Sequence, residues 1–386
     1  MPRAAYLKFS PPFIGEEEIA EVVDTLRTEW ITTGPKTKRF EGEFAEYVGA
    51  EAALALNSCT AGLHTALTAL GIGPGDEVIT TPMTFASTVN VIEHVGARPV
   101  LADVLPDVLT LDPARTAAVV TAHTKALLPV HFAGHPAEMD PLTALAETHG
   151  LAIVEDAAHA LPAQYKGRTI GAGHNLTAFS FYATKNMTTS EGGMLTGPAA
   201  LIDEARVISL HGMSRDAWKR YDTGGNWFYE VVCPGYKYNM TDIQASLGLW
   251  QLRKLARFQE RRHEVVAAYQ AAFAGCDALE TPSEHPEAAS AWHLYTLRLR
   301  PEMLRIERDQ FIRELHARNI GTSVHFIPIH LHPYYREKYG FQPEDFPVAY
   351  ANYLRMVSLP LNPHLDDADV ADVIEAVLEI VEANRA

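Results

Sequence analysis

The chain has 386 residues, of which 47% are hydrophobic and 21% are charged, a composition typical of soluble globular proteins. This length predicts either two domains or one large α/β unit with a smaller appendage. The formal net charge of −16 argues against non-specific binding to nucleic acid or to an acidic membrane surface. Cys59, Cys233 and Cys276 are scattered and odd in number, and the first ten residues lack an apolar core. We therefore expect a cytoplasmic protein with neither a disulfide framework, a zinc site nor a membrane span.

Helix and strand patterns alternate along the N-terminal half, after an arm of about 35 residues that carries one amphipathic helix. We expect helices over 16–27, 40–48, 61–70, 86–95 and 139–149, and strands over 52–56, 77–80, 99–103, 126–130, 151–154, 178–182 and 193–196. Nearly continuous apolar strands that alternate with helices predict a mainly parallel sheet covered on both faces. The ligands of such sheets bind at the carboxyl ends of the strands.

A long helical pattern begins at Asp242 and runs to about Ala274, and a second set of elements follows it. We expect strands over 292–299 and 321–326, a helix over 307–318 and a final helix from about Asp367. These elements predict a smaller C-terminal α/β domain. We assign the arm and the large domain to residues 1–254 and the small domain to residues 255–386, with the long helix linking the two.

The apolar, aromatic run from Ala178 to Ala183 predicts a buried strand, and Lys185 follows it closely. Lysine is rarely placed at the end of a buried segment unless it has a partner or a chemical role. Loss of hydration lowers the pKa of a lysine, and its neutral amine can then attack a carbonyl group. The alternative is a lysine whose ammonium reaches back to solvent, and this residue alone leaves both interpretations open.

Small and hydroxylated residues, among them Ser58, Cys59 and Thr60, follow the first strand and open a helix. The free N–H groups and the positive dipole end of a helix start suit a phosphate. An ordinary helix cap by Ser58 or Thr60 is the alternative. The glycine-rich run 71–76 follows a helix instead of joining a strand to one, so we interpret it as a turn and not as a dinucleotide-binding loop.

The apolar strand over 151–154 ends in two carboxylates, the second of which is Asp156. At the edge of a parallel sheet Asp156 is expected near Thr60 and Lys185, and a buried aspartate needs a cationic partner. The protonated ring nitrogen of pyridoxal phosphate is such a partner, and a lysine that carries this cofactor is the companion feature. Metal-dependent hydrolysis fits less well, because no carboxylate-rich ligand set accompanies the histidines between 325 and 332.

Several motifs stand in a fixed order and spacing along the chain. They are residues 30–35, 57–64, 71–79, 155–159, 180–186, 191–193 and 235–244. This set resembles the DegT/StrS family of sugar-nucleotide aminotransferases, and the similarity covers nearly the whole chain, from the arm to Leu361. Residues 291–295 and 321–326 are most similar to the branch that acts on UDP-linked 4-keto sugars, the UDP-4-amino-4-deoxy-L-arabinose–oxoglutarate aminotransferases.

The resemblance implies a type I pyridoxal phosphate-dependent transferase fold, with a large domain around a mainly parallel mixed sheet and a smaller C-terminal α/β domain. It also implies a homodimer whose active sites lie at the subunit boundary. Lys185 would carry pyridoxal 5'-phosphate and move a proton during the reaction, and Asp156 would keep the ring nitrogen protonated. His159 would donate a hydrogen bond to the phenolic oxygen, and Phe85 would stack on the ring.

The resemblance further assigns residues to the cofactor phosphate and to the substrate. The backbone amides of Cys59 and Thr60 and the hydroxyl of Ser180 would hold the phosphate. Lys237 would reach the phosphate from the partner subunit, at a position where many relatives carry asparagine. The candidates for contacts to the sugar or its nucleotide are Trp30, Thr32, His325 and His330.

The predicted reaction moves the amino group of glutamate to a keto group, the 4-keto position, of a nucleotide-linked sugar for polysaccharide or amino-sugar biosynthesis, and releases 2-oxoglutarate. One alternative is a sugar dehydratase, but related dehydratases carry histidine in place of the lysine, so Lys185 favours transamination. The other is a regulatory protein that only binds the cofactor, and the acidic chain lacks the basic DNA-binding segment that such regulators usually append. Pro162 and Ser190 stand where relatives often carry glycine, and we expect them to alter loop shape without abolishing activity.

Overall fold

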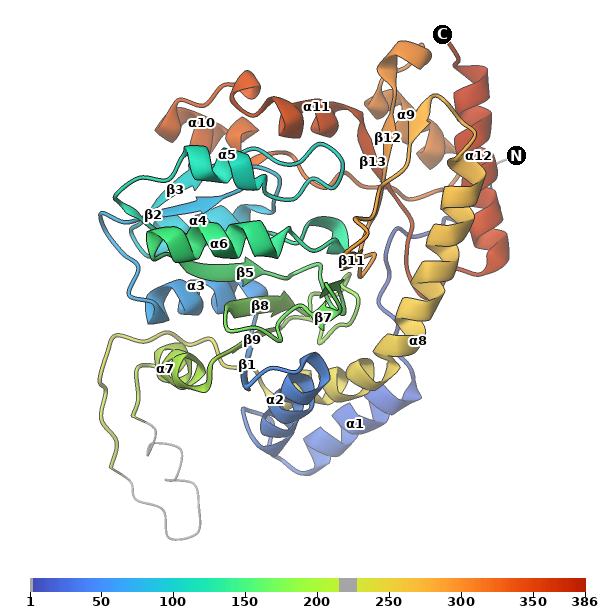
Figure 1. Ribbon diagram of the computed structural model, residues 1–386. Coiled ribbons are helices and arrows are strands. Elements are labelled where there is room, and N and C mark those ends of the chain that lie inside the picture. Colours follow the sequence, from blue (N-terminus) through green and yellow to red (C-terminus); the bar gives the residue numbers. More distant parts are fainter. Residues whose placement is uncertain (1–2, 215–227) are drawn as a thin grey trace.

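The computed structural model describes residues 3–214 and 228–386 and is built around one large sheet (Figure 1). The strand order of this seven-stranded sheet is β1-β9-β8-β5-β4-β2-β3. Its strands are β1 (Ala52–Leu56), β2 (Glu77–Thr80), β3 (Arg98–Leu101), β4 (Thr124–Leu127), β5 (Ala152–Asp156), β8 (Leu176–Ser180) and β9 (Gly193–Gly197). Neighbouring strands from β8 to β3 are parallel, whereas β9 is antiparallel to both β1 and β8. The predicted mainly parallel sheet is therefore confirmed.

Both faces of the large sheet are covered by helices, and successive strand residues contribute to opposite faces. The helices on one face are α3 (Cys59–Ala69), α4 (Ala86–His94) and α7 (Ala199–Ser209); those on the other are α2 (Pro35–Val48), α6 (Met139–His149) and the first part of α8 (Asp242–Phe273). Leu54 and Val154 pack in the first layer, whereas their neighbours Ala55 and Ile153 pack in the second. Burial on both faces explains why these strands are apolar almost throughout.

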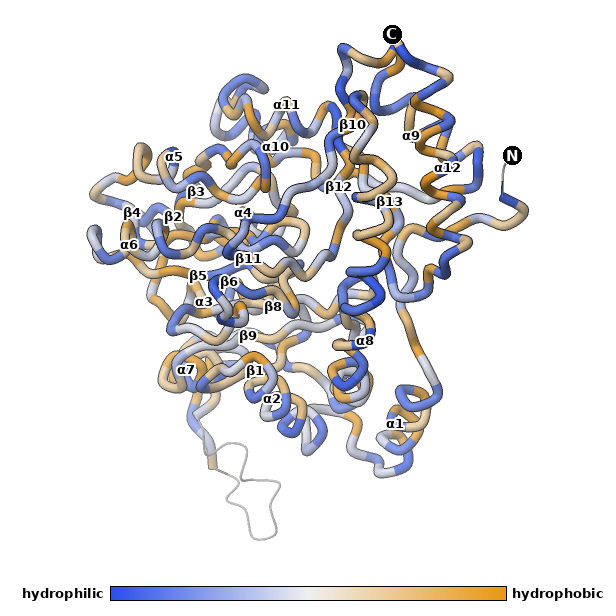
Figure 2. The backbone as a smooth tube through the Cα atoms, turned by 45° about the vertical axis from the view of Figure 1, so that its right-hand side comes forward, coloured by the Kyte–Doolittle hydropathy of each residue, from blue (hydrophilic) through white to orange (hydrophobic). Residues whose placement is uncertain are grey.

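The 32-residue helix α8 leads from the large sheet to a smaller C-terminal unit (Figure 1). This unit has an antiparallel sheet of β10 (Leu279–Glu280), β12 (Tyr295–Leu299) and β13 (Met356–Leu359), and its helices include α9 (Arg308–Ala317) and α12 (Asp367–Ala383). Hydropathy alternates along α12 in Figure 2, because Val370, Val373 and Val377 are buried on one side of that helix. The sequence predicted α12, α9 and α8 to within one or two residues.

Two expectations for the C-terminal part need comment. The strand expected over 321–326 is not formed: only Ser323 makes a bridge, to Ser358 of β13, because the chain then turns towards the large sheet. The segment after this turn contains α10 (Pro333–Tyr339) and α11 (Pro347–Arg355) and packs with Met83, Val89 and Phe132 of the N-terminal part. The boundary expected at 254/255 falls inside α8, and the division into two domains stays a prediction.

The remaining elements are short and lie around the large sheet. They are α5 (Pro113–Ala118) and a three-stranded sheet of β6 (Gln164–Tyr165), β7 (Arg168–Thr169) and β11 (Ala288–Ala289). None of the helices within 3–214 and 228–386 is long and apolar enough to span a bilayer.

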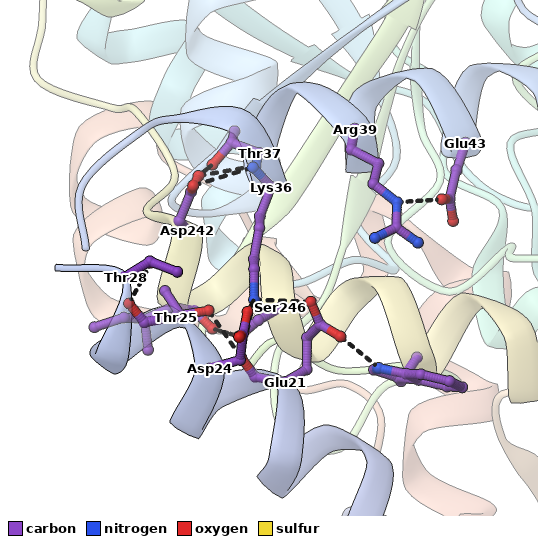
Figure 3. Close-up of polar contacts among 12 residues, drawn as sticks. Glu21, Asp24, Thr25, Thr28, Lys36, Thr37, Arg39, Glu43, Asp242 and Ser246 are labelled. Atoms are coloured by element: carbon purple, nitrogen blue, oxygen red, sulfur yellow. Dashed lines mark hydrogen bonds and ion pairs between the residues drawn. The ribbon is translucent and has the colours of Figure 1, made fainter. Parts of the chain in front are cut away.

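Helix α1 (Glu16–Arg27) packs along α8 through polar side chains, which is unusual for an amphipathic helix. Its Glu21 and Asp24 bind the Lys36 ammonium at the start of α2, at 2.8 Å and 2.7 Å (Figure 3). The buried Glu18 accepts hydrogen bonds from α8 side chains, whereas the apolar side chains of α1, led by Ile19 and Leu26 at 48% and 54% exposure, face solvent.

Candidate active site

A cavity of about 400 Å³ lies at the carboxyl ends of the parallel strands, where it was predicted. Its lining includes eight of the predicted site residues: Cys59, Thr60, Phe85, Asp156, His159, Ser180, Lys185 and His325. The loops after β1, β5 and β8 supply most of these side chains, and the loop before α10 supplies His325 together with Phe326. The structure thus brings together residues that are up to 266 positions apart in the sequence (325 − 59).

Asp156 is the last residue of β5 and is only 4% exposed. One carboxylate oxygen accepts a hydrogen bond from the Thr88 hydroxyl at 2.7 Å, and the other accepts one from the Ala158 N–H at 3.1 Å. Burial raises the pKa of the Asp156 carboxyl, although both hydrogen bonds oppose that change. Among the described residues no cationic side chain lies within ion-pair distance of this carboxylate, so a cation brought by a ligand would find an unpaired buried partner.

Lys185 lies in the loop after β8, five positions beyond Ser180, and its amine lines the cavity. Burial lowers the pKa of this amine to about 8, while the Cys59 thiol and Asp156 act in the opposite direction. The next residue, Asn186, is buried and donates its amide hydrogens to the carbonyls of Leu161 and Ala291, at 2.9 Å and 2.8 Å. The lysine therefore extends from a firmly anchored backbone and carries a substantial neutral fraction near neutrality.

The start of α3 forms a second functional part of the cavity. Ser58 caps the helix by accepting a hydrogen bond from the Ala61 N–H at 3.0 Å, which leaves the preceding N–H groups of Cys59 and Thr60 without intrahelical partners. Strand β9 passes so close that a Cβ atom on Gly193 would lie 2.5 Å from the Cys59 nitrogen. The two interpretations of this segment are compatible, since a capped helix start still offers free donors to an anion.

The Cys59 thiol faces the same space but is an unsuitable nucleophile. Its sulfur donates to the Ala178 carbonyl at 3.5 Å and lies 4.0 Å from an oxygen of Asp156. Burial, with the nearby negative charge of Asp156, raises the pKa of the Cys59 thiol well above its ordinary value. The group is therefore a neutral thiol, and the amine of Lys185, with its lowered pKa, is the better nucleophile of the two.

His159 is held as a neutral imidazole of one tautomer. Its Nδ1 accepts a hydrogen bond from the backbone N–H of Ala133 at 3.2 Å, so the ring proton resides on Nε2. Burial and the charge of Lys185 lower the pKa of His159 well below its ordinary value. Across the cavity Phe85 is 61% exposed, which leaves its ring face open to a planar ligand.

Three of the other predicted residues line a different cavity. Trp30, Thr32 and Lys237 surround a hollow of about 1070 Å³ between the arm, α2 and the loop before α8. Asp242 fixes this arm, because its buried carboxylate accepts hydrogen bonds from the N–H groups of Gly34, at 2.8 Å, and of the α2 residues that follow (Figure 3). Within one chain these residues do not reach the cavity of Lys185.

His330 does not line either cavity. It is fully buried, its Nε2 lies 3.2 Å from the Pro343 carbonyl oxygen, and its ring packs against Phe346. It lies beside Phe346, which belongs to the core that the C-terminal segment shares with the large unit. Within the described part of the chain, no three or more His, Cys, Asp or Glu side chains are grouped so that they could hold a metal ion.

The sequence reasoning did not assign Thr88, Asn186 or His293 to the site. Thr88 contacts Asp156, His293 contacts His159, and Asn186 in turn contacts His293. Asn186 follows Lys185 directly, and its position at the end of the aromatic strand was the one available signal. Thr88 contacts Asp156 from α4 and carries no comparable signal, whereas His293 stands in the family-like segment 291–295 before β12.

The match to known proteins covers the same residues that build this cavity. The model of the DegT/DnrJ/EryC1/StrS aminotransferase family matches residues 12–378. The chain belongs to this family. It is 53% identical over 381 residues to the spore coat polysaccharide biosynthesis protein SpsC of Bacillus subtilis, an alignment that covers 98% of both chains.

Solved structures of other family members have the same fold. The putative sugar aminotransferase Spr1654 from Streptococcus pneumoniae, in its PMP-form, superposes with a TM-score of 0.92 at 39% identity over 98% of this chain and 99% of its own. Its PLP-form superposes with a TM-score of 0.91. Helicobacter pylori PseC, an aminotransferase involved in the biosynthesis of pseudoaminic acid, covers 98% of this chain with a TM-score of 0.90 at 28% identity. The fold is accordingly the predicted type I fold of pyridoxal phosphate-dependent transferases.

Proposed function

We propose that this aminotransferase uses pyridoxal 5'-phosphate to move the amino group of glutamate to a keto group, at position 4, of a nucleotide-linked sugar. The observation that carries the proposal is the meeting of three groups in one cavity: the Lys185 amine with its lowered pKa, the unpaired Asp156 carboxylate and the free start of α3. Each group alone has an ordinary structural explanation. Together they match pyridoxal phosphate, whose carbonyl group suits the amine, whose cationic ring suits the carboxylate and whose phosphate suits the helix start.

The residues present fit this cofactor. Asp156 would face the protonated ring nitrogen, which supplies the positive partner that the buried carboxylate lacks. The amides of Cys59 and Thr60, with the hydroxyl of Ser180 at the end of β8, would hold the phosphate at the positive end of α3. Phe85 would cover one face of the ring.

When bound, pyridoxal phosphate supplies a ring that withdraws electrons from the carbon atom attached to the transferred nitrogen. The neutral amine of Lys185 would accept the proton from that carbon and deliver it to the cofactor carbon bonded to the same nitrogen. A pKa of about 8 suits this exchange, since both protonation states are accessible near neutrality. His159, neutral and protonated on Nε2, would donate a hydrogen bond to the phenolic oxygen without adding a charge.

The sugar half of the site would be completed by a second copy of the chain. Phe85 and Tyr182 at the cavity mouth are 61% and 47% exposed, and α1 presents Ile19 and Leu26 to solvent, as expected for surfaces that a homodimer covers. Across such an interface Lys237 would reach the phosphate of the partner's cofactor. Trp30 and Thr32 would approach the nucleotide-linked sugar from the same side, and His325 would approach it from within the chain.

The experiment is to incubate the purified protein with glutamate and a panel of 4-keto sugar nucleotides, and to analyse the products by mass spectrometry. An amino sugar together with 2-oxoglutarate is the expected result. A deoxy sugar without amination would identify a dehydratase instead, and cofactor absorbance that does not change on addition of glutamate would indicate a binding protein without catalysis.

A further inference from the structure

The ring of His159 contacts two other rings in the wall of the cavity. The His293 ring lies against one side, with centroids 4.4 Å apart, and Phe326 is stacked on it at 5.6 Å with an angle of 23° between the planes. His293 is 5% exposed and lines the cavity, but it belongs to the segment before β12, far from β5 in the sequence. Nothing in the proposed mechanism uses it.

The hydrogen bonds around His293 determine which of its nitrogens carries the proton. Both amide hydrogens of Asn186 go to backbone carbonyls, those of Leu161 and Ala291, so the oxygen of Asn186 must be an acceptor. This oxygen lies 3.1 Å from Nδ1 of His293, which therefore carries the proton. Nε2 of His293 has no hydrogen-bond partner among the described residues, and it keeps its lone pair.

The backbone of His293 is fixed from behind by a buried arginine. Arg262 of α8 is 1% exposed and donates to the carbonyls of Trp292 and Leu361, at 3.2 Å and 2.9 Å, and at 3.5 Å to that of His293 itself. The neighbouring charged or titratable groups that face His293 are Arg262, Lys185, His159 and His325, and each of them disfavours a second positive charge there. The ring is thus fixed in place and in tautomer, and it stays uncharged.

We propose that Asn186 and His293 are positioning residues: Asn186 fixes the ring and tautomer of His293, and His293 holds His159 so that its Nε2–H remains the free donor in the cavity. This inference rests on the proposed function, because His159 acts on the cofactor. Because Asn186 directly follows Lys185, the contact between Asn186 and His293 also links the loop of Lys185 to His159. Two neighbouring imidazoles are thereby fixed with opposite tautomers by groups that cannot exchange donor and acceptor roles.

The first test uses the cofactor-free protein with isotope-labelled histidine. Nitrogen chemical shifts should identify His159 as the Nε2–H tautomer and His293 as the Nδ1–H tautomer at neutral pH. Asn186→Ala should convert the His293 signal to a mixture of tautomers. Asn352→Ala, which removes another buried asparagine bonded to a backbone carbonyl, should leave both signals unchanged. A His293 signal that is already mixed or protonated in the wild type would overturn the proposal.

The second test is a double-mutant cycle on kcat with the loaded enzyme. His293→Ala should lower kcat by about 10- to 100-fold, the loss expected when a catalytic group is misplaced by about 1 Å, with little change in KM for glutamate. It should also move the pH midpoint at which the bound cofactor changes its absorbance. In a His159→Phe background His293→Ala should have no further effect, because it acts through His159. His293→Phe, which keeps the ring face but lacks the Nδ1–H bound by Asn186, should restore only part of the activity.

The outcomes separate this inference from the proposed function. Losses that multiply in the double variant would show that His293 acts independently of His159 and would reject the positioning role. A wild type that does not transaminate would reject the proposed function itself, whereas the tautomers in the cofactor-free protein would still be measurable. Should His293→Ala fail to fold, Asn186→Asp carries the test: its carboxylate favours a charged His293, so the acid limb of the pH–rate profile should move to higher pH.

Discussion

The two cavities of this protein are built in different ways. The cavity of Lys185 collects residues from the ends of neighbouring strands, and the register of the sheet, in which Asp156 pairs with Ala178, fixes their distances. The cavity of Trp30 and Lys237 is formed by an arm and a loop, and Trp30 is 44% exposed there. The residues that need a fixed geometry thus lie at the edge of a sheet. The residues that would contact a substrate across an interface lie on the arm and on a loop.

The two cavities also differ in how many of their functional groups one chain supplies. The sheet-edge cavity contains a lysine amine, a buried carboxylate and the start of helix α3 from one chain. The arm cavity is lined by both polar and apolar side chains, and its lysines within the described residues, Lys38 and Lys237, are both exposed. We therefore expect substitutions in the first cavity to abolish the chemistry, and substitutions in the second to be rescued by another subunit.

The largest effect is expected from Lys185→Ala. Loss of the amine should lower transamination by about a thousandfold or more and remove the absorbance of the lysine-bound cofactor. The matched control is Lys166→Ala, since Lys166 is an exposed lysine that pairs with Asp140 and Glu287 outside both cavities. Steady-state kinetics and absorbance spectra check the prediction, and full turnover by the Lys185 variant would show that the nucleophile has been misassigned.

A mixing experiment tests whether the arm cavity serves the partner subunit. Lys237→Ala alone should lower activity by about tenfold, because a lysine–phosphate contact is a charge-assisted hydrogen bond. When it is mixed with Lys185→Ala, subunit exchange should create dimers with one intact site and restore about a quarter of the wild-type activity.

Mass spectrometry of the intact dimers in the mixture measures the extent of subunit exchange, and size-exclusion chromatography with light scattering reports the oligomeric state. If the mixture has only the average activity of its two components, Lys237 acts within its own chain, and the distinction between the two cavities fails.

Most of the sheet-edge cavity could be predicted from the sequence because its geometry follows from a general rule. Parallel strands end at one edge, so residues that follow buried strands, such as Asp156 and Lys185, must lie close together. Most helices and strands of the large unit were found because burial on both faces leaves strong apolar patterns, but α5 and α7 were not among the expected helices. The family motifs then added the roles of His159 and Phe85.

Other parts could not be predicted, for identifiable physical reasons. The segment 321–326 has the apolar, β-branched composition of a strand, but its neighbours in space decide that only Ser323 pairs. His330 was named only as a candidate for contacts to the sugar or its nucleotide, and its burial depends on the packing of α11 and Phe346. The contact of Thr88 with Asp156 and that of His293 with His159 depend on the fold, because α4 and the segment before β12 are far from β5 in the sequence.

The pH dependence of cofactor binding sharpens the description of the sheet-edge cavity. Only the neutral amine attacks the carbonyl group, and burial lowers the pKa of Lys185 to about 8. The rate at which pyridoxal phosphate attaches covalently to Lys185 of the cofactor-free protein should therefore rise about tenfold per pH unit below pH 7 and level off above about pH 8. Asp156→Asn removes a negative charge that favours the ammonium, so its midpoint should lie at lower pH.

Stopped-flow absorbance after addition of pyridoxal phosphate measures this rate. A midpoint close to 10, the value of an exposed lysine, would show that the amine remains hydrated in solution.

The smallest effect is expected at Ser190, next to the loop of Lys185. Its backbone is left-handed, with φ of 70°, and its side chain is exposed. Ser190→Gly should relieve about 1 kcal/mol of strain, but the more flexible unfolded chain offsets part of this gain, so we expect about 0.5 kcal/mol of added stability. The same change at Ser209, in helix α7, should destabilise the protein instead, because glycine is a poor helix former.

Thermal unfolding measures both variants, and since Ser190 does not line the cavity, kcat should stay unchanged. A loss of activity without a loss of stability would mean that the serine shapes the lysine loop, and that this departure from the family pattern has a functional role.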